Sequence, residues 1–537
     1  MDKEPRESGV LPNSTQTPAG ALLARRAEAI VGRLRASRRR RCLPAFLAIQ
    51  LALLVFGLDL LPAWTDEYST LETAPRSLSE IAAWARGDVH PPLYFFLLHF
   101  WYRLPLPGSP LTRLRAVSVL FTLLATWLLD RLWLRRLPTT TRLWFLALWV
   151  TSPCLILYAR MARSYTAQVA VAAVAFYASS RWLERAGDWR RFLLCAGTLV
   201  LTLYVHYIPG GAILVALNVC LAWRALREGK RLWVRALLAL DAAVAIGTLP
   251  WWYGIWASLH RWSGGGFPYR VGDNVFLDTL AKLAYWFVSF SFGEALPVPT
   301  LLAAAALTPL MLYFAWRGLQ TRPDWLPLVI VAAIVGFVGV ARWVSFPFVP
   351  ARLMFLLPFY LLLVLEGCAR HRRARTVFCL TLLLTYITGL YSYFTRAAFL
   401  NKGYAAPFDE IASLVKNNSP PATLVVIDPY NTDAFPLRDR IPQPSLLLDS
   451  QATLDRILAE LRRGDYQKIW HLRTTHDLSP GGLNRRLEQE LAARCSVRRH
   501  LFLPYSAPER WLISLLGWPE QPTHFYQALE AARCRAD

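Results

Sequence analysis

Long apolar runs alternate with short basic segments along the first 400 residues of the chain. The first run, residues 43–62, has about the length that a helix needs to cross a bilayer. Similar runs follow, so we predict about eleven membrane-crossing helices. Their expected positions are 43–62, 113–133, 142–158, 164–181, 192–223 (two helices), 236–254, 298–317, 325–342, 350–368 and 375–395.

Two further apolar segments are predicted to lie in the membrane interface. Residues 93–102 are aromatic but too short to span a bilayer. Residues 260–293 begin with a polar, glycine-rich stretch and then become amphipathic, which is typical of an outer loop with an interfacial helix.

The pattern changes near residue 401, where hydropathy falls. Short β-type runs at 423–427 and 468–472 alternate with helical patterns at 408–416 and 453–463. The alternation continues through 483–494, 498–503, 511–515 and 525–532. We therefore predict a mainly α protein with three parts. These are a basic arm (1–42), a polytopic helical membrane bundle (43–398, first outer loop 63–92) and a soluble α/β domain (399–537).

The net charge is +23, and the distribution of the basic residues agrees with the predicted topology. Basic residues cluster in short loops between the apolar runs, which is the signal of cytoplasmic loops and does not form a nucleic-acid-binding stripe. Arg33, Arg35 and residues 38–41 abut the first helix, so we expect a cytoplasmic N-terminus. An odd number of crossings then places the C-terminal domain outside the cytoplasm. We expect the plasma or inner membrane as the location of the protein.

The cysteines fit this division of the chain. Six of the eight lie in or beside apolar runs and are expected to pack as small hydrophobic residues. Cys495 and Cys534 lie in the soluble domain, where an oxidising compartment would allow a disulfide, although spacing alone does not show one.

A charged segment from Trp64 to His99 follows the first helix. Asp66 and Glu67 stand together at the membrane exit. Asp88 and His90 precede a pair of prolines that prevents a helix before it and favours a helix start after it. His90 is therefore expected at a bend.

Polar residues from five connections are expected to meet at the outer membrane face. Ionisable groups at membrane depth are costly and usually mark a functional cavity. The residues predicted to converge are Asp66, Glu67, Asp88, His90, Arg160, Arg163, Tyr165, His206, Arg342 and Arg352.

An Asp-Glu pair after the first helix, followed by the sequence Asp88-Val-His-Pro-Pro-Leu-Tyr94, resembles the polyprenyl-phosphate-sugar-dependent glycosyltransferases of the membrane-embedded C superfamily. Protein O-mannosyltransferases (glycosyltransferase family 39) and the lipid A aminoarabinose transferase are the relatives that it suggests. The resemblance implies an inverting transfer of a sugar from a polyprenyl phosphate donor to an acceptor hydroxyl on a cell-envelope glycan, a lipid or a protein.

The same resemblance implies roles for individual residues. Asp66 would be the general base, with Glu67 as its neighbour and possible substitute. Arg163 and Tyr165 match an Arg-x-Tyr element that meets the donor phosphate, while Arg160-Met161 depart from the polar residues often found before it. The residues expected to bind the donor phosphate or sugar are Asp88, His90, Arg160, Arg163, Tyr165, His206 and Arg352.

Alternatives remain open at this point. Asp66 and Glu67 could equally be solvated loop residues without a catalytic role. Arg163 could equally be an arginine that extends from a helix end to the membrane interface without binding a substrate. No cofactor is expected, although Asp66, Glu67 and Asp88 would suffice for one Mg²⁺ with waters. A transporter or flippase of a lipid-linked sugar would use similar charges, and a noncatalytic scaffold would be unaffected by changes at Asp66. The expected partners are the lipid-linked donor, a hydroxyl acceptor and membrane lipids, and no nucleic acid.

Overall fold

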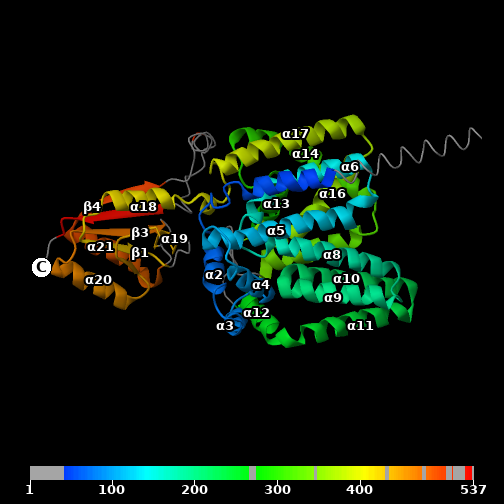
Figure 1. Cartoon of the computed structure of the whole chain (residues 1–537), viewed down its shortest axis with the longest axis horizontal. Helices are drawn as coiled ribbons and strands as arrows, with labels where there is room; N and C mark the ends of the chain where they lie inside the picture. The colour runs from blue at the N-terminus through cyan, green and yellow to red at the C-terminus, as the bar shows by residue number, and fades with distance from the viewer. Residues whose placement is uncertain are drawn as a thin grey trace, which may run out of the picture.

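Figure 1 shows the computed structural model, which describes residues 42–264, 274–343, 348–429, 435–438, 440–474, 479–502, 511 and 526–534. Residues 1–41 of the predicted basic arm and most of the predicted segment 511–515 lie outside these residues.

Helices form nearly all of the described chain up to residue 394. They are Cys42–Val55, α2 (Thr65–Thr73), α3 (Leu78–Gly87), α4 (Leu93–Tyr102), α5 (Pro110–Leu132), α6 (Thr139–Thr151), α7 (Pro153–Ala159), α8 (Tyr165–Glu184), α9 (Trp189–Val205), α10 (Tyr207–Glu228), α11 (Arg231–Thr248), α12 (Trp252–Gly264), α13 (Val275–Phe292), α14 (Val298–Gln320), α15 (Leu326–Val338), α16 (Leu357–Cys368) and α17 (Arg372–Phe394). Short turns of other helical types are η1 (Leu134–Arg136), η2 (Leu249–Trp251), η3 (Gly339–Trp343), η4 (Pro350–Leu356) and η5 (Lys402–Ala405).

Seven helices in the described part of the chain are long and apolar enough to cross a membrane, or eight if the bent pair α6–α7 counts as one span. Four of the predicted crossings fall in helices that are too short or not apolar enough to meet this criterion for crossing a membrane. They are 43–62, 164–181, the first of the pair in 192–223, and 325–342. Helix α13 was expected in the interface, but it is long and apolar enough to span. The polytopic α-helical class predicted from the sequence is confirmed.

The bend between α6 and α7 lies inside what the sequence suggested was one helix. The two segments meet at 49°. Pro153 supplies no backbone N–H to the preceding turn, and Ser152 caps the new helix by accepting from Leu155 N–H at 3.3 Å. After the break, α7 leads directly into the loop 160–164, which contains the predicted site residues Arg160 and Arg163.

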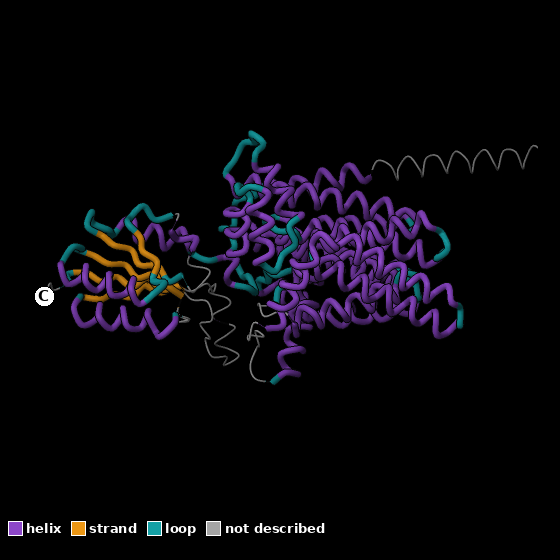
Figure 2. The backbone as a smooth tube through the Cα atoms, turned by 90° about the horizontal axis from the view of Figure 1, so that it is seen from below, coloured by secondary structure: helices purple, strands orange, loops and turns teal. Residues whose placement is uncertain are grey.

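The predicted first outer loop is largely helical, because α2 and α3 fill it. Together with α4 and α12 they cover one end of the bundle, and the α/β domain lies beyond that same end (Figure 1). Figure 2 shows the same order from a second direction, with the sheet separate from the bundle along the long axis.

The C-terminal domain is a three-layer α/β unit. Its strands are β1 (Thr423–Ile427), β2 (Ser445–Leu447), β3 (Lys468–Thr474), β4 (Ser496–Phe502) and β5 (Tyr526–Ala532), and its helices are α18 (Phe408–Asn417), α19 (Phe435–Arg438), α20 (Gln451–Arg463) and α21 (Leu483–Arg494), with the turn η7 (Pro480–Gly482). The sheet order is β2-β1-β3-β5-β4, with β1 parallel to β2 and β3, and β5 antiparallel to both of its neighbours.

Each face of this sheet has its own hydrophobic core. Val425 and Ile427 of β1 pack with α18 and α19, while Leu424 and Val426 pack with α20 and α21. This follows from the two-residue alternation of side chains along a strand. The strands expected at 423–427 and 468–472 are confirmed. Cys495 and Cys534 form a disulfide that joins the start of β4 to the chain after β5.

Candidate active site

Helix α2 carries the adjacent acids Asp66 and Glu67 in its first turn, where the helix dipole stabilises carboxylates. The two side chains have different surroundings. The Asp66 side chain keeps 38% of its surface exposed, whereas Glu67 is fully buried.

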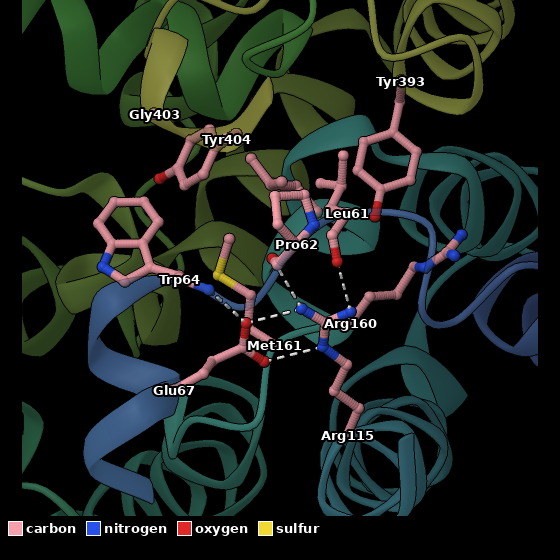
Figure 3. A pocket seen from close by; sticks show the side chains of 11 residues that line it. Leu61, Pro62, Trp64, Glu67, Arg115, Arg160, Met161, Tyr393, Gly403 and Tyr404 are labelled. Carbon is pink, nitrogen blue, oxygen red and sulfur yellow. Dashed lines mark hydrogen bonds and ion pairs between the residues drawn. The ribbon is translucent and has the colours of Figure 1, made fainter. Parts of the chain in front are cut away.

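Glu67 is held on both of its oxygens. Arg115 of α5 donates from Nε to Oε1 at 2.8 Å and from Nη2 to Oε2 at 2.7 Å. Backbone N–H groups of Ala162 and Trp64 donate to the same carboxylate at 2.7 and 3.0 Å. Figure 3 shows this forked pair beside Trp64. The expectation that Glu67 could substitute as the base does not fit this geometry, because all of these donors need the carboxylate ionised and in place.

The same arginine fixes the chain that leads into α2. Arg115 also donates to the carbonyl oxygens of Leu58, Leu61 and Pro62 at 2.9 to 3.1 Å. The buried ion pair therefore ties together the segment after the first helix, α2 and the loop 160–164.

Asp66 lies against Arg163, a buried guanidinium in the loop before α8. Arg163 Nη2 is 3.5 Å from Asp66 Oδ2, and Nη1 donates to the Asp66 carbonyl oxygen at 3.0 Å. Nη2 also donates to His90 Nε2 at 2.7 Å. Because that nitrogen accepts, the ring proton of His90 lies on Nδ1, which donates to Asp88 Oδ2 at 3.0 Å. The structure thus joins Asp66, Arg163, His90 and Asp88 in one chain of contacts.

The carboxylate of Asp88 remains ionised in this chain. Partial burial raises its pKa, but the hydrogen bond from His90 outweighs that effect and lowers the pKa below its ordinary value. The predicted bend at His90 is also present, since α3 ends at Gly87 and α4 begins at Leu93 after the proline pair.

Tyr165, His206 and Arg352 lie near Arg163. Tyr165 starts α8 and hydrogen-bonds Arg163. His206 lies between α9 and α10, 6.4 Å from His90 between ring centroids. Burial and the charges of Arg352 and Arg163 lower the pKa of His206 well below its ordinary value, so the ring is neutral. Gln168 of α8 donates to the Ala351 carbonyl at 2.7 Å and so holds η4, which carries Arg352, against this group.

Two adjoining hollows open beside these residues. One is lined by Asp66, Arg163, Tyr165, Tyr158 and Val349, and the other by Glu67, Arg115, Arg160 and Tyr393, among others. Trp64, Met161 and Tyr404 line both and form the partition between them. The first hollow brings an exposed carboxylate, a buried guanidinium and a phenol together.

Two predicted site residues have other contacts. The guanidinium of Arg160 donates to the carbonyl oxygens of Leu53 and Gly57 and lies over the rings of Tyr393 and Phe394. In Figure 3 it points away from Glu67 and Trp64. Arg342 contacts Asp278 of α13 at 3.3 Å, in a cluster with Lys282 that is separate from the chain around Asp66. Neither guanidinium is aimed at Asp66.

Sequence reasoning missed five residues that shape the site: Trp64, Arg115, Tyr158, Glu294 and Tyr404. Arg115 gave a usable signal, because a charged residue within an apolar helix usually has a function or a partner. Tyr404 gave none, since it lies beyond the last predicted crossing and reaches the site only through the fold.

The carboxylates expected to suit Mg²⁺ do not gather as a set of three, because Glu67 is held by Arg115. Within the described ranges, no three His, Cys, Asp or Glu side chains lie together in a way that could hold a metal ion.

Comparison with known proteins identifies the fold. No protein-family model matches the chain, and no curated protein matches it. Among solved structures, ArnT from Cupriavidus metallidurans bound to undecaprenyl phosphate has a TM-score of 0.53 at 13% identity, over 91% of this chain and 97% of that one. The apo structure of the same protein has a TM-score of 0.52 at 12% identity, with the same coverage. The chain therefore shares the fold of ArnT from Cupriavidus metallidurans.

Proposed function

We propose that this chain is an inverting glycosyltransferase. It would move a sugar from a polyprenyl phosphate carrier to an acceptor hydroxyl at the outer membrane face, with Asp66 as the general base. One observation carries the proposal: an exposed carboxylate lies 3.5 Å from a buried guanidinium, at the end of an apolar helical bundle. A base and a phosphate-binding cation are the two groups that this transfer needs.

The proposed reaction is a single displacement. The acceptor oxygen attacks the anomeric carbon while Asp66 takes the proton of its hydroxyl. The bond between the anomeric carbon and the phosphate oxygen breaks, and its electron pair leaves with the polyprenyl phosphate. One displacement inverts the anomeric configuration. Phosphate is a good leaving group, so no acid partner is required, in contrast to the paired carboxylates of glycosidases.

Arg163 is proposed to bind the departing phosphate, because a guanidinium can donate two parallel hydrogen bonds to phosphate oxygens. Asp88 and His90 would hold Arg163 in place, and Arg352, Tyr165 and His206 would complete the polar side of the site. With cations in this role, we propose that transfer needs no metal ion and continues after chelation with EDTA.

The donor class is supported by the fold shared with ArnT, whose structure holds undecaprenyl phosphate. The proposed orientation places the N-terminus in the cytoplasm and the α/β domain outside it, at the cell membrane. Two observations support this orientation: the basic loops, and the disulfide between Cys495 and Cys534, since disulfides persist in oxidising compartments.

A transporter or flippase of a lipid-linked sugar is the second candidate, because the bent pair α6–α7 is a broken helix of the kind that transporters use. The chain of contacts among Asp66, Arg163, His90 and Asp88 lies at one end of the bundle, which favours chemistry at that face.

The test is sugar transfer from radiolabelled polyprenyl phosphate donors by membranes that contain the wild-type protein, with a donor panel of hexoses and pentoses. We expect label to move from the lipid carrier to a new product, with polyprenyl phosphate released. Movement of intact labelled carrier between the leaflets of sealed vesicles, with no cleavage of any donor, would overturn the proposal in favour of the flippase.

A further inference from the structure

The segment that joins the bundle to the α/β domain packs tightly on the bundle. We call residues 396–405 the tether. Phe399 pairs with Ala295 as an isolated β-bridge, and backbone hydrogen bonds of 2.8 Å run from Leu296 N–H to the Ala398 carbonyl and from Leu400 N–H to the Glu294 carbonyl. Phe399 is 1% exposed. The tether is therefore part of the packed bundle and is more than a linker.

Two tether residues adopt an unfavourable backbone conformation. Arg396 and Ala398 have φ angles of 56° and 55°, in the left-handed region that non-glycine residues rarely occupy. Such conformations persist only where surrounding contacts hold them, and they often lie near functional sites. Here the contacts with residues 294–296 hold the path of the chain.

Tyr404 is the tether residue whose side chain lines the site. It is 3% exposed, and its ring lies 4.5 Å from that of Trp64 between centroids. Its hydroxyl donates to the hydroxyl of Tyr158 at 3.2 Å, and Tyr158 donates to Glu294. Figure 3 shows Tyr404 and Trp64 on the same side of the pocket.

Glu294 anchors this line of hydroxyls. Its buried carboxyl also accepts hydrogen bonds from Tyr285 at 2.6 Å and from Ser289 at 2.9 Å. A buried polar group with several partners is fixed in position, because losing one partner is costly. The position of Tyr404 is thus determined by α13 and α7 as well as by the tether.

This placement puts Tyr404 beside the proposed base. Trp64 directly precedes α2 and lies two residues before Asp66, and the ring of Tyr158 packs on Tyr165 at 5.6 Å. Tyr404 lines the hollow that holds Asp66 and Arg163. Trp64 and Tyr404 therefore line the hollow in which, in the proposed function, Asp66 meets the acceptor and Arg163 binds the donor phosphate.

We infer that the tether forms part of the wall of the transfer site, with Tyr404 as a positioning residue that excludes water from the anomeric carbon. The inference rests on the proposed function. Excluding water matters because water is a competing nucleophile. In that side reaction a water oxygen would bond to the anomeric carbon, Asp66 would take its proton, and free sugar and polyprenyl phosphate would be released.

The test measures how the sugar is partitioned between two products. Membranes with wild type, Tyr404→Ala or Tyr404→Phe are given a radiolabelled polyprenyl phosphate sugar, and label in free sugar is divided by label in transferred product. We expect this ratio to rise about fivefold or more in Tyr404→Ala, and to stay near the wild-type value in Tyr404→Phe, which keeps the ring. The ratio does not depend on how much protein folds.

Tyr285→Phe is the matched control, because it removes a hydrogen bond to the same Glu294 but does not line the hollow. We expect its ratio to match wild type. An unchanged ratio in Tyr404→Ala, even with a lower total rate, would overturn the inference while leaving the proposed function intact. A wild-type protein that cleaves no donor would overturn both.

Discussion

Asp66 and Glu67 are neighbours on α2, yet the charge clusters around them differ. Around Glu67 the cluster is closed: the carboxylate and Arg115 are both buried, and the pair is completed by backbone groups. Around Asp66 the cluster is partly open, with a carboxylate 38% exposed against a buried Arg163 at a looser 3.5 Å. The first arrangement suits a fixed scaffold, and the second leaves a carboxylate that a substrate can reach from solvent.

The difference shows how two adjacent acids at a membrane exit can have different roles, one structural and one catalytic. A buried ion pair with several hydrogen bonds holds three segments in register, and its carboxylate must keep its charge and position. A base needs the opposite, since it must contact the acceptor and take up a proton. The following predictions test this division, from the largest expected effect to the smallest.

Glu67→Ala is expected to have the largest effect on stability. It leaves the Arg115 guanidinium buried without its carboxylate, which typically costs roughly 3–5 kcal/mol. We expect little folded protein, or an unfolding temperature in detergent far below wild type. Asp66→Ala should unfold near the wild-type temperature. Equal stability losses for the two variants would contradict the comparison.

Arg163→Gln is expected to weaken donor binding by about 100-fold, because roughly 2–3 kcal/mol of charge-assisted hydrogen bonding to phosphate is lost. The measurement is equilibrium binding of polyprenyl phosphate to the purified protein. Arg160→Gln is the comparison, since its guanidinium is directed at Leu53 and Gly57 carbonyls. We expect that variant to lose stability and to keep most of its donor affinity; the reverse pattern would assign the phosphate to Arg160.

Asp88→Ala is expected to weaken donor binding by about tenfold, through the loss of one charged hydrogen bond that orients His90 toward Arg163. Because the pKa of Asp88 is lowered by His90, the stabilisation from this contact is fully present above the ordinary value of 3.8 and is lost as pH falls through the lowered pKa. The Asp88 carboxylate should therefore stay ionised and keep this contact between pH 7 and 5. A wild-type affinity equal to that of Asp88→Ala would show that the chain of contacts has no role.

Arg456→Gln is expected to have the smallest effect. Arg456 pairs with Glu460 on the surface of the α/β domain with 64% of its side chain exposed, and exposed pairs contribute little. We expect no measurable change in unfolding temperature or transfer rate. A loss comparable to that of Glu67→Ala would mean that burial does not explain the strength of the Glu67 cluster.

Local patterns were enough to predict much of the fold. The strand at 423–427 matches β1 because both faces of the sheet are buried and every residue after Thr423 is apolar. The α4 start was predictable because prolines act on their immediate neighbours. The α6–α7 break was missed although Ser152-Pro153 marks it, because the apolar run continues across it.

The site could be predicted only in part. The sequence places Asp66, His90, Arg163 and Tyr165 at one face, and the structure brings them together. It does not reveal that Glu67 pairs with Arg115, 48 residues away, or that Tyr404 contacts Tyr158 across 246 residues. These long-range contacts determine which carboxylate is exposed and which is buried, and no local sequence pattern encodes them.

The most direct measurement of the central claim is the rate of sugar transfer by Asp66→Asn, with donor binding measured on the same preparation. Glu72→Gln is the matched control, because it removes the same charge from an exposed position of the same helix. We predict that Asp66→Asn binds polyprenyl phosphate as wild type does but transfers sugar at least about 100-fold more slowly, while Glu72→Gln is unaffected. Undiminished transfer by Asp66→Asn would contradict the assignment of Asp66 as the base.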